Sequence, residues 1–285
     1  MAAAQSRETI TFDAMEDAAS EQVTVKQAVL SSRFLLRDVT VDFYVPSIII
    51  SSKPLSLLLI NDGQNLAEMQ FAGMLENVMR DGMMRPVLCA GIHAGTERKM
   101  EYGTANVLDY EGRGAKAKAY QQFILHELLP YVQQTYRFAS LHSIAIAGFS
   151  LGGLQAIDAA WNHPGVFSIA GVFSGSLWWR LKDLNNGYNE ATDRIMHKQI
   201  REGEYQAGLR FYFTTGSLDE TSDRNNNGII DSIDDTMGLI EELQNKGYKT
   251  GTDIHYINYN DGRHDVATWG RAMPHFLNWA FPLQG

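Results

Sequence analysis

The chain has 285 residues, of which 45% are hydrophobic and 20% are charged, which is ordinary for a globular protein. Its formal net charge of −9 gives no support for binding to nucleic acid or to an anionic membrane surface. The apolar runs are all far shorter than the roughly 20 residues of a membrane-spanning helix. We therefore expect neither a nucleic-acid partner nor a membrane partner, and the oligomeric state stays open.

The amino-terminal residues and the single cysteine say little about compartment. Residues 1–16 include Asp13 and Glu16 and hold no apolar stretch, so they are not a signal peptide as they stand, and we expect a cytoplasmic location. A precursor that had lost its leader would look the same. Cys89 cannot form an internal disulfide, and its apolar neighbours predict a small buried side chain.

The predicted elements fall into two parts along the chain. Residues 21–30 and 34–45 alternate apolar and polar side chains, as half-buried antiparallel strands do. After Pro54, apolar strand-like runs alternate with helical segments. The further strands are predicted at residues 55–60, 86–92, 143–147, 169–173, 209–215 and 252–259. The helices are predicted at residues 65–81, 115–134, 151–162, 232–246 and 268–280.

This order predicts one α/β domain over residues 1–285. Strands without polar alternation, joined by crossover helices, indicate a parallel sheet that is covered on both faces. We expect a doubly wound, mostly parallel sheet with antiparallel strands at its amino-terminal side and helices on both faces. In such sheets, ligands bind at the carboxyl ends of the strands.

A candidate nucleophile follows the predicted strand at residues 143–147. Residues 148–152 have the pattern Gly-x-Ser-x-Gly, with Ser150 in the middle and a predicted helix directly behind it. A strand that turns this sharply into a helix holds its serine at strained backbone angles, and side chains at Gly148 or Gly152 would collide with neighbouring backbone. The alternative is an ordinary strand-to-helix turn with a capping serine.

The base and the acid should follow later strands. His264 comes directly after the last predicted strand, in a turn-rich loop where a general base would be placed. The strand at residues 209–215 is followed by Asp219 and Glu220. Only one of them can orient the imidazole; we favour Asp219, with Glu220 second and Asp223 third.

Two backbone N–H groups are expected to stabilise an oxyanion. The first belongs to Leu151, directly after the nucleophile, at the positive end of a helix. The second should come from the loop after the strand at residues 55–60, where we prefer Gln64 to Gly63. A helix-capping turn built by Asp62 and Asn65 would explain the same residues.

Residues 223–234 have the spacing of an EF-hand-type calcium loop, with Gly228 at position 6. Its oxygen ligands would be Asp223, Asn225, Asn227, the carbonyl of Ile229, Asp231 and Asp234. Asp234 stands where a sensor loop has glutamate and resembles the loops of dockerin modules, but no second copy exists to imply cohesin binding. We expect a possible structural calcium that fixes the loop carrying Asp219, whereas the alternative is an Asn- and Gly-rich surface loop.

Each of two further clusters of residues has two alternative interpretations, one functional and one structural. Trp178 and Trp179 follow a strand end, where they form either an aromatic platform for substrate or part of the core. Arg98, Glu101 and Tyr102 follow another strand, where they either shape a pocket or form a structural ion pair.

Several of these segments together resemble the esterase D and enterochelin-esterase-like family of α/β-hydrolases, which includes feruloyl and acetyl-xylan esterases. The matching segments are residues 61–65, 98–102, 127–130, 148–153, 173–176, 216–219, 264–269 and 276–277. The resemblance implies the α/β-hydrolase fold, with Ser150 as nucleophile, His264 as base and Asp219 as acid. Some siderophore-hydrolysing members work with a reduced dyad, which makes the acid the least certain role.

The predicted function is hydrolysis of a small-molecule carboxylic ester through an acyl-enzyme, with no cofactor for catalysis. A thioesterase or an acyltransferase would use the same residues. A protein of another class, a non-catalytic binding protein on a hydrolase scaffold, would keep the fold without the reaction.

Overall fold

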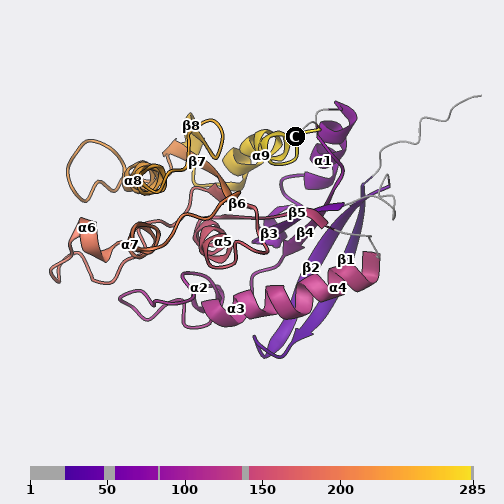
Figure 1. The fold of residues 1–285 in the computed structure, drawn as a ribbon, viewed down its shortest axis with the longest axis horizontal. Helices are drawn as coiled ribbons and strands as arrows, with labels where there is room; N and C mark the ends of the chain where they lie inside the picture. The colour runs from indigo at the N-terminus through magenta and orange to yellow at the C-terminus, as the bar shows by residue number, and fades with distance from the viewer. Residues whose placement is uncertain (1–22, 48–54, 83, 137–140, 284–285) are drawn as a thin grey trace, which may run out of the picture.

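The computed structural model describes residues 23–47, 55–82, 84–136 and 141–283. Within these ranges, eight strands form one sheet in the order β1-β2-β4-β3-β5-β6-β7-β8 (Figure 1). The strands are β1 Val23–Ser32, β2 Arg37–Pro46, β3 Leu55–Asn61, β4 Val87–Ile92, β5 Leu141–Phe149, β6 Ile169–Phe173, β7 Arg210–Leu218 and β8 Ile254–Arg263. Residues 1–22, including residues 1–16 that we expect not to be a signal peptide, lie outside the described residues.

The pairing of the strands confirms the predicted fold class. The hairpin β1–β2 is antiparallel and joins β4 in antiparallel register, whereas β4, β3, β5, β6, β7 and β8 pair in parallel. Parallel neighbours require crossover connections, which the helices supply. The carboxyl ends of the parallel strands therefore meet at one edge of the sheet.

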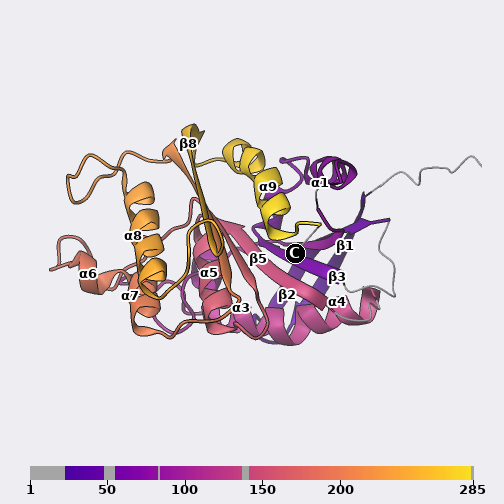
Figure 2. The ribbon, with the colours of Figure 1, turned by 45° about the horizontal axis from the view of Figure 1, so that its top comes forward.

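Helices cover both faces of this sheet (Figures 1 and 2). They are α1 Phe71–Arg80, α2 Arg98–Glu101, α3 Ala117–Phe123, α4 Leu129–Tyr136, α5 Leu151–Asn162, α6 Glu190–Asp193, α7 Ile195–Glu202, α8 Asp231–Asn245 and α9 Val266–Ala280. Helices α1 and α9 lie on one face; α3, α4 and α5 lie on the other, where α7 and α8 extend the layer. No helix in the described ranges is long and apolar enough to cross a membrane.

Each face of the sheet buries its own apolar cluster. In β5, Ile144 and Ile146 pack toward α5, whereas Ala145 and Ala147 pack toward α9. This two-residue period on a strand that is buried on both sides explains why its sequence shows no polar alternation. Cys89 is fully buried in β4, as predicted.

Several helices differ from the predicted helices in their bounds or were not predicted. The helix expected at residues 65–81 begins only at Phe71, after a 3₁₀ turn at Gly63–Asn65. The helix expected at 115–134 is α3 and α4 joined by a π-helical turn at Ile124–Leu128. Helices α2, α6 and α7 were not predicted; α2 and α6 have four residues each, and α7 has eight.

Strands β7 and β8 run further than predicted, and glycines make this possible. A Cβ on Gly216 would lie 2.4 Å from the backbone of Gly262, so the two chains approach closely where they leave the sheet. Gly216 pairs with Tyr259 and Leu218 with Arg263, which carries the pairing to the sheet edge. The residues that follow, Asp219 and His264, therefore leave the sheet side by side.

Candidate active site

Ser150 occupies a strained turn between β5 and α5. Its φ of 57° and ψ of −122° lie in a region that residues with a side chain rarely adopt. The Ser150 N–H donates to the carbonyl of Phe173 (3.0 Å), which ties the turn to β6. A Cβ on Gly148 would lie 2.3 Å from the carbonyl oxygen of Gly152, which is the predicted backbone collision, whereas a Cβ on Gly152 would instead lie 2.7 Å from the side-chain Oδ2 of Asp62.

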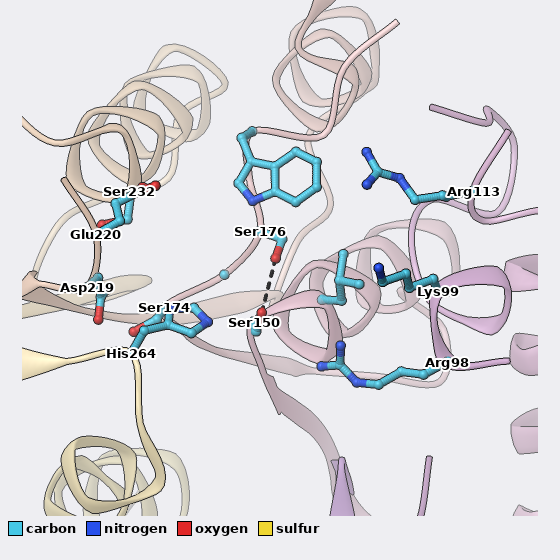
Figure 3. A pocket seen from close by; sticks show the side chains of 13 residues that line it. Arg98, Lys99, Arg113, Ser150, Ser174, Ser176, Asp219, Glu220, Ser232 and His264 are labelled. Atoms are coloured by element: carbon cyan, nitrogen blue, oxygen red, sulfur yellow. Dashed lines mark hydrogen bonds between the residues drawn. The ribbon is translucent and has the colours of Figure 1, made fainter. Parts of the chain in front are cut away.

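Ser150, Asp219 and His264 line one cavity of about 420 Å³ (Figure 3). They come from the carboxyl ends of β5, β7 and β8, and the imidazole of His264 lies between Asp219 and Ser150. The volume falls in the range of small-molecule sites. The structure therefore brings together the three residues that the sequence predicted, although they are far apart in the chain.

The environment of His264 favours the neutral imidazole. Burial lowers its pKa below 6.5; Arg98 lowers it further, whereas Asp219 and Asp265 oppose the shift. Its ring stands edge-on to the indole of Trp269, with centroids 5.2 Å apart. Asp265 accepts the N–H of Thr268 (2.8 Å) and so caps α9 directly after the histidine. A neutral imidazole is the form that can accept a proton from serine.

Asp219 has one carboxylate oxygen available for the histidine. Its Oδ2 accepts the backbone N–H of Gly216 (3.0 Å), which fixes the side chain in the turn after β7. Its Oδ1 is buried and has no hydrogen-bond partner within the described residues. A buried oxygen of this kind calls for a partner, and the group beside it is the imidazole of His264, whose pKa the Asp219 charge raises.

The two alternative acids are engaged elsewhere. Glu220 lines the same cavity, but its carboxylate accepts the backbone N–H of Ser232 at the start of α8. Burial, then the charge of Asp231, raise the pKa of Glu220. Asp223 accepts the N–H groups of Asn227 and Gly228 within its own loop. The geometry therefore favours Asp219.

Of the two predicted oxyanion donors, Leu151 lines the cavity and Gln64 does not. The Gln64 side chain accepts the N–H of Ala94 (3.0 Å) and donates to Asp62 (3.3 Å). Gly63, the other residue considered, is pressed against the backbone of Gly91. The loop thus packs on β4 at Gly63, and the side chain of Gln64 is engaged outside the cavity.

Arg98 occupies the wall of the cavity instead. Its Nε and Nη2 bind the carboxylate of Asp62 (2.7 Å each), and Nη2 also donates to the carbonyl of Phe149 (3.3 Å). The guanidinium is held beside the nucleophile turn and lines the cavity with Ser150. The sequence placed Arg98 near a pocket but gave no signal of this contact, which depends on the left-handed conformation of Asp62 (φ 60°).

The cavity wall opposite the acids is cationic and aromatic. Lys99, Arg113 and Trp178 line it, and the Arg113 guanidinium lies 5.1 Å from the centroid of a Trp178 ring. Trp179 is fully buried, and a Cβ on Gly103 would lie 2.6 Å from its ring. The predicted pair therefore divides: Trp178 faces the cavity, and Trp179 belongs to the core.

Glu101 and Tyr102 support the site without entering it. Glu101 is fully buried and binds the guanidinium of Arg37 (2.6 and 2.7 Å), so the structural ion pair is the correct interpretation. The Tyr102 hydroxyl accepts the N–H of Asp62 (3.1 Å). This contact places the carboxylate that holds Arg98.

The loop at residues 223–234 gives no support to the predicted calcium site. Asn225 and Asn227 donate their side-chain amides to the carboxylate of Asp234 (3.1 and 3.0 Å), and Asp223 accepts backbone N–H groups. Ile229 donates its N–H to the side chain of Asn227 (2.8 Å). Within the described ranges, no group of three or more His, Cys, Asp or Glu side chains is arranged to hold a metal ion. The polar groups of the loop satisfy one another.

Arg224 anchors this loop to its surroundings. Its N–H donates to the carboxylate of Asp231 (2.9 Å), and its guanidinium binds Asp235 on α8 and Glu190 on α6. The Arg224 side chain is only 5% exposed. The task predicted for a calcium ion, fixing the segment that follows Asp219, is thus performed by a buried arginine.

A strained serine between strand and helix, with histidine and carboxylate at the ends of later strands, defines a protein of the α/β-hydrolase class. Residues 32–280 match the family model described as putative esterase. The chain therefore belongs to this esterase family, which confirms the resemblance.

The relatives that match include a curated protein and several solved structures. The iron(III) salmochelin esterase of Escherichia coli O6:H1 is 24% identical over 238 residues, which cover 82% of this chain and 52% of the relative. The crystal structure of the enterobactin esterase from Shigella flexneri with enterobactin has a TM-score of 0.68 at 21% identity, and the match covers 90% of this chain and 58% of that one. A ferulic acid esterase has a TM-score of 0.68 at 18% identity, over 92% and 98% of the two chains. The chain thus spans between half and three fifths of the first two relatives.

Proposed function

We propose that this protein hydrolyses carboxylic esters by two-step acyl transfer, with Ser150 as nucleophile, His264 as general base and Asp219 as the acid that orients the imidazole. The observation that carries the proposal is the convergence of these side chains on one cavity around a strained serine. Backbone strain of this kind persists at functional sites because the surrounding structure enforces it.

The reaction begins when Ser150 Oγ attacks the ester carbonyl carbon and His264 takes the serine proton. The carbon–oxygen bond to the alcohol then breaks, and the alcohol leaves with the proton that His264 returns. Water attacks the acyl-enzyme in the same manner and releases the acid. These steps use only side-chain and backbone groups of the chain.

The oxyanion of each tetrahedral intermediate is assigned two donors. The first is the backbone N–H of Leu151 at the start of α5. For the second we propose the guanidinium of Arg98 in place of Gln64, because Arg98 lines the cavity and Gln64 does not. A fixed positive charge is well suited to a developing negative one, and the Asp62 contact prevents the guanidinium from moving away.

For the substrate, we propose an ester with an aromatic component that bears an acidic or electron-rich substituent. The Trp178 indole offers a face for a ring, and Lys99 offers positive charge on the same wall, where Arg113 is already paired with Asp109 and Glu111. Relatives named for enterobactin and for ferulic acid agree with this preference.

The test compares Ser150→Ala with the parent protein on 4-nitrophenyl acetate and on a panel of aryl, feruloyl and catechol-bearing esters. We expect a loss of more than about 10³-fold in kcat and no labelling by a fluorophosphonate. Ser143→Ala is the matched control, since its hydroxyl donates a hydrogen bond to Ser56 at the far end of β5. Full hydrolysis by Ser150→Ala would refute the proposal; equal kcat/KM for acetyl and catechol-bearing esters would refute the substrate preference.

A further inference from the structure

Ser176 lies beside the nucleophile, in the loop that follows β6. Its Oγ is 3.3 Å from the Oγ of Ser150 (Figure 3). Ser176 is only 4% exposed, and no other hydrogen-bond partner of its hydroxyl is found in the described part of the chain. A buried hydroxyl with one partner is committed to that partner, and here the partner is the nucleophile itself.

The loop is built to hold Ser176 in this place. The Ser176 N–H donates to the carbonyl of Ser150 (3.0 Å), so backbone and side chain both contact the same residue. Ser174, two residues earlier, has a φ of 44°, donates its N–H to Thr214 (2.8 Å) and accepts the indole N–H of Trp269 (3.1 Å). A strained residue that is tied to β7 and α9 fixes the path of the loop.

The chemistry of the pair requires one direction of hydrogen bonding. A serine hydroxyl has one proton to donate and two lone pairs that accept. If Ser150 donated to Ser176, its proton would point away from His264, which must receive it. If Ser176 donates, its proton occupies one lone pair of Ser150 Oγ and leaves the Ser150 proton free for the imidazole.

We propose that Ser176 is a positioning residue, which donates a hydrogen bond to Ser150 Oγ and so directs the Ser150 proton toward His264. The inference rests on the proposed function. The same hydrogen bond strengthens as negative charge develops on Oγ, because charge-assisted hydrogen bonds are stronger than neutral ones. Ser176 thereby assists the attack step without taking part in covalent chemistry.

The experiment measures the second-order rate constant for inactivation by a fluorophosphonate, in which Ser150 Oγ bonds to phosphorus, fluoride leaves and the serine proton passes to His264. The rate of this reaction depends on the attack by Ser150 Oγ and not on a later deacylation step. For Ser176→Ala we expect a decrease of about 10-fold in this rate constant and a similar decrease in kcat, with KM within about 2-fold.

Two matched comparisons separate this role from a structural one. Ser176→Thr and Ser176→Val have the same shape, so the proposal requires the hydroxyl-bearing threonine to react about 10-fold faster than the valine at equal melting temperature. Ser168→Ala removes a hydroxyl from the opposite end of the β6 segment and should react as the parent does. The Thr/Val comparison stays decisive where Ser176→Ala folds poorly.

Equal inactivation rates for the parent and Ser176→Ala, or for the Thr and Val variants, would overturn the inference. Such a result leaves the proposed function intact if Ser150→Ala is inactive. Activity retained by Ser150→Ala would instead remove the proposed function and this inference together.

Discussion

Asp158 is the buried charge whose removal has the most predictable effect on stability. It lies on α5, the helix behind the nucleophile, and is fully buried. Its carboxylate accepts the N–H of Ala105 (2.8 Å) and the side-chain amides of Gln121 (2.7 Å) and Gln199 (3.0 Å). These donors connect α5 to α3, to α7 and to the loop that leads to the cationic cavity wall.

Burial raises the pKa of Asp158 from 3.8 to about 6, against the opposing effect of these hydrogen bonds. One pKa unit corresponds to about 1.4 kcal/mol, so the ionised carboxylate costs the folded state about 3 kcal/mol. Because the folded pKa is the higher one, the folded state holds the extra proton between pH 4 and pH 6. Stability is therefore lost as pH rises through this window, and the loss is complete above it.

Asp158→Asn removes this titration and keeps the shape. The Asn oxygen can accept from Ala105 and Gln121, while its amide faces Gln199, which must rotate; failure to rotate would cost about 1 kcal/mol at every pH. We expect the unfolding free energy of the variant, relative to the parent, to rise by about 3 kcal/mol between pH 4 and pH 7. The variant is thus slightly less stable than the parent in acid and more stable at neutrality.

The assay is urea denaturation at fixed pH values from 4 to 8, followed by tryptophan fluorescence and by circular dichroism, which must agree for the free energies to be compared. Glu204→Gln, at an exposed carboxylate, is the control and should give curves parallel to the parent. If the pH dependence of the unfolding free energy were the same for Asp158→Asn and the parent, the reasoning would be refuted. Such a result would mean that the pKa of Asp158 is the same in the folded and unfolded states.

Three further predictions concern the catalytic cavity. The acid limb of the kcat/KM profile should have its midpoint below pH 6.5, since burial lowers the pKa of His264; Asp219→Asn should move it lower and Arg98→Gln higher, because the two charges act in opposite directions. Movement of both in the same direction would contradict the assigned contacts. Asp219→Asn should reduce kcat at least 10-fold more than Glu220→Gln, and a larger effect of Glu220→Gln would reassign the acid. Gly148→Ala should destabilise by about 3 kcal/mol in chemical denaturation, through its clash with Gly152, whereas Gly73→Ala on α1, where a Cβ meets open space, should stabilise slightly.

The sequence could bring Ser150 and His264 forward as the candidate nucleophile and base because their signals are local. The motif around Ser150 depends on glycines that leave no room for a Cβ, and His264 follows directly on a strand. The acid was only favoured, because Asp219 and Glu220 are adjacent and their directions depend on β7 ending at Leu218. That end is decided by the close approach of Gly216 to Gly262, a contact between segments far apart in the chain.

Two other predictions show the same limit of local patterns. Gln64 was chosen for its backbone N–H because it follows a strand, and this role stays a prediction, although Gln64 does not line the cavity and its side chain binds Ala94. The calcium spacing in residues 223–234 is also a local pattern, whereas Arg224 reaches Glu190 and Asp235, which lie outside it. Side-chain partners of high sequence separation leave no periodicity to detect.

The order of the strands explains why the loop after β6 contributes to the site. The proposed nucleophile Ser150 follows β5, the proposed acid Asp219 follows β7 and the proposed base His264 follows β8, and β6 lies between β5 and β7 in the sheet. In a parallel sheet, neighbouring strands are about 4.8 Å apart, so the residues directly after β6 must come between the nucleophile and the acid. The residues at this place, Ser174, Gly175 and Ser176, are all small. A serine at position 176 is small enough to leave room for substrate and can still donate a hydrogen bond to Ser150. Ser176→Val fills the same space without a donor, so it is the change that tests the arrangement most severely.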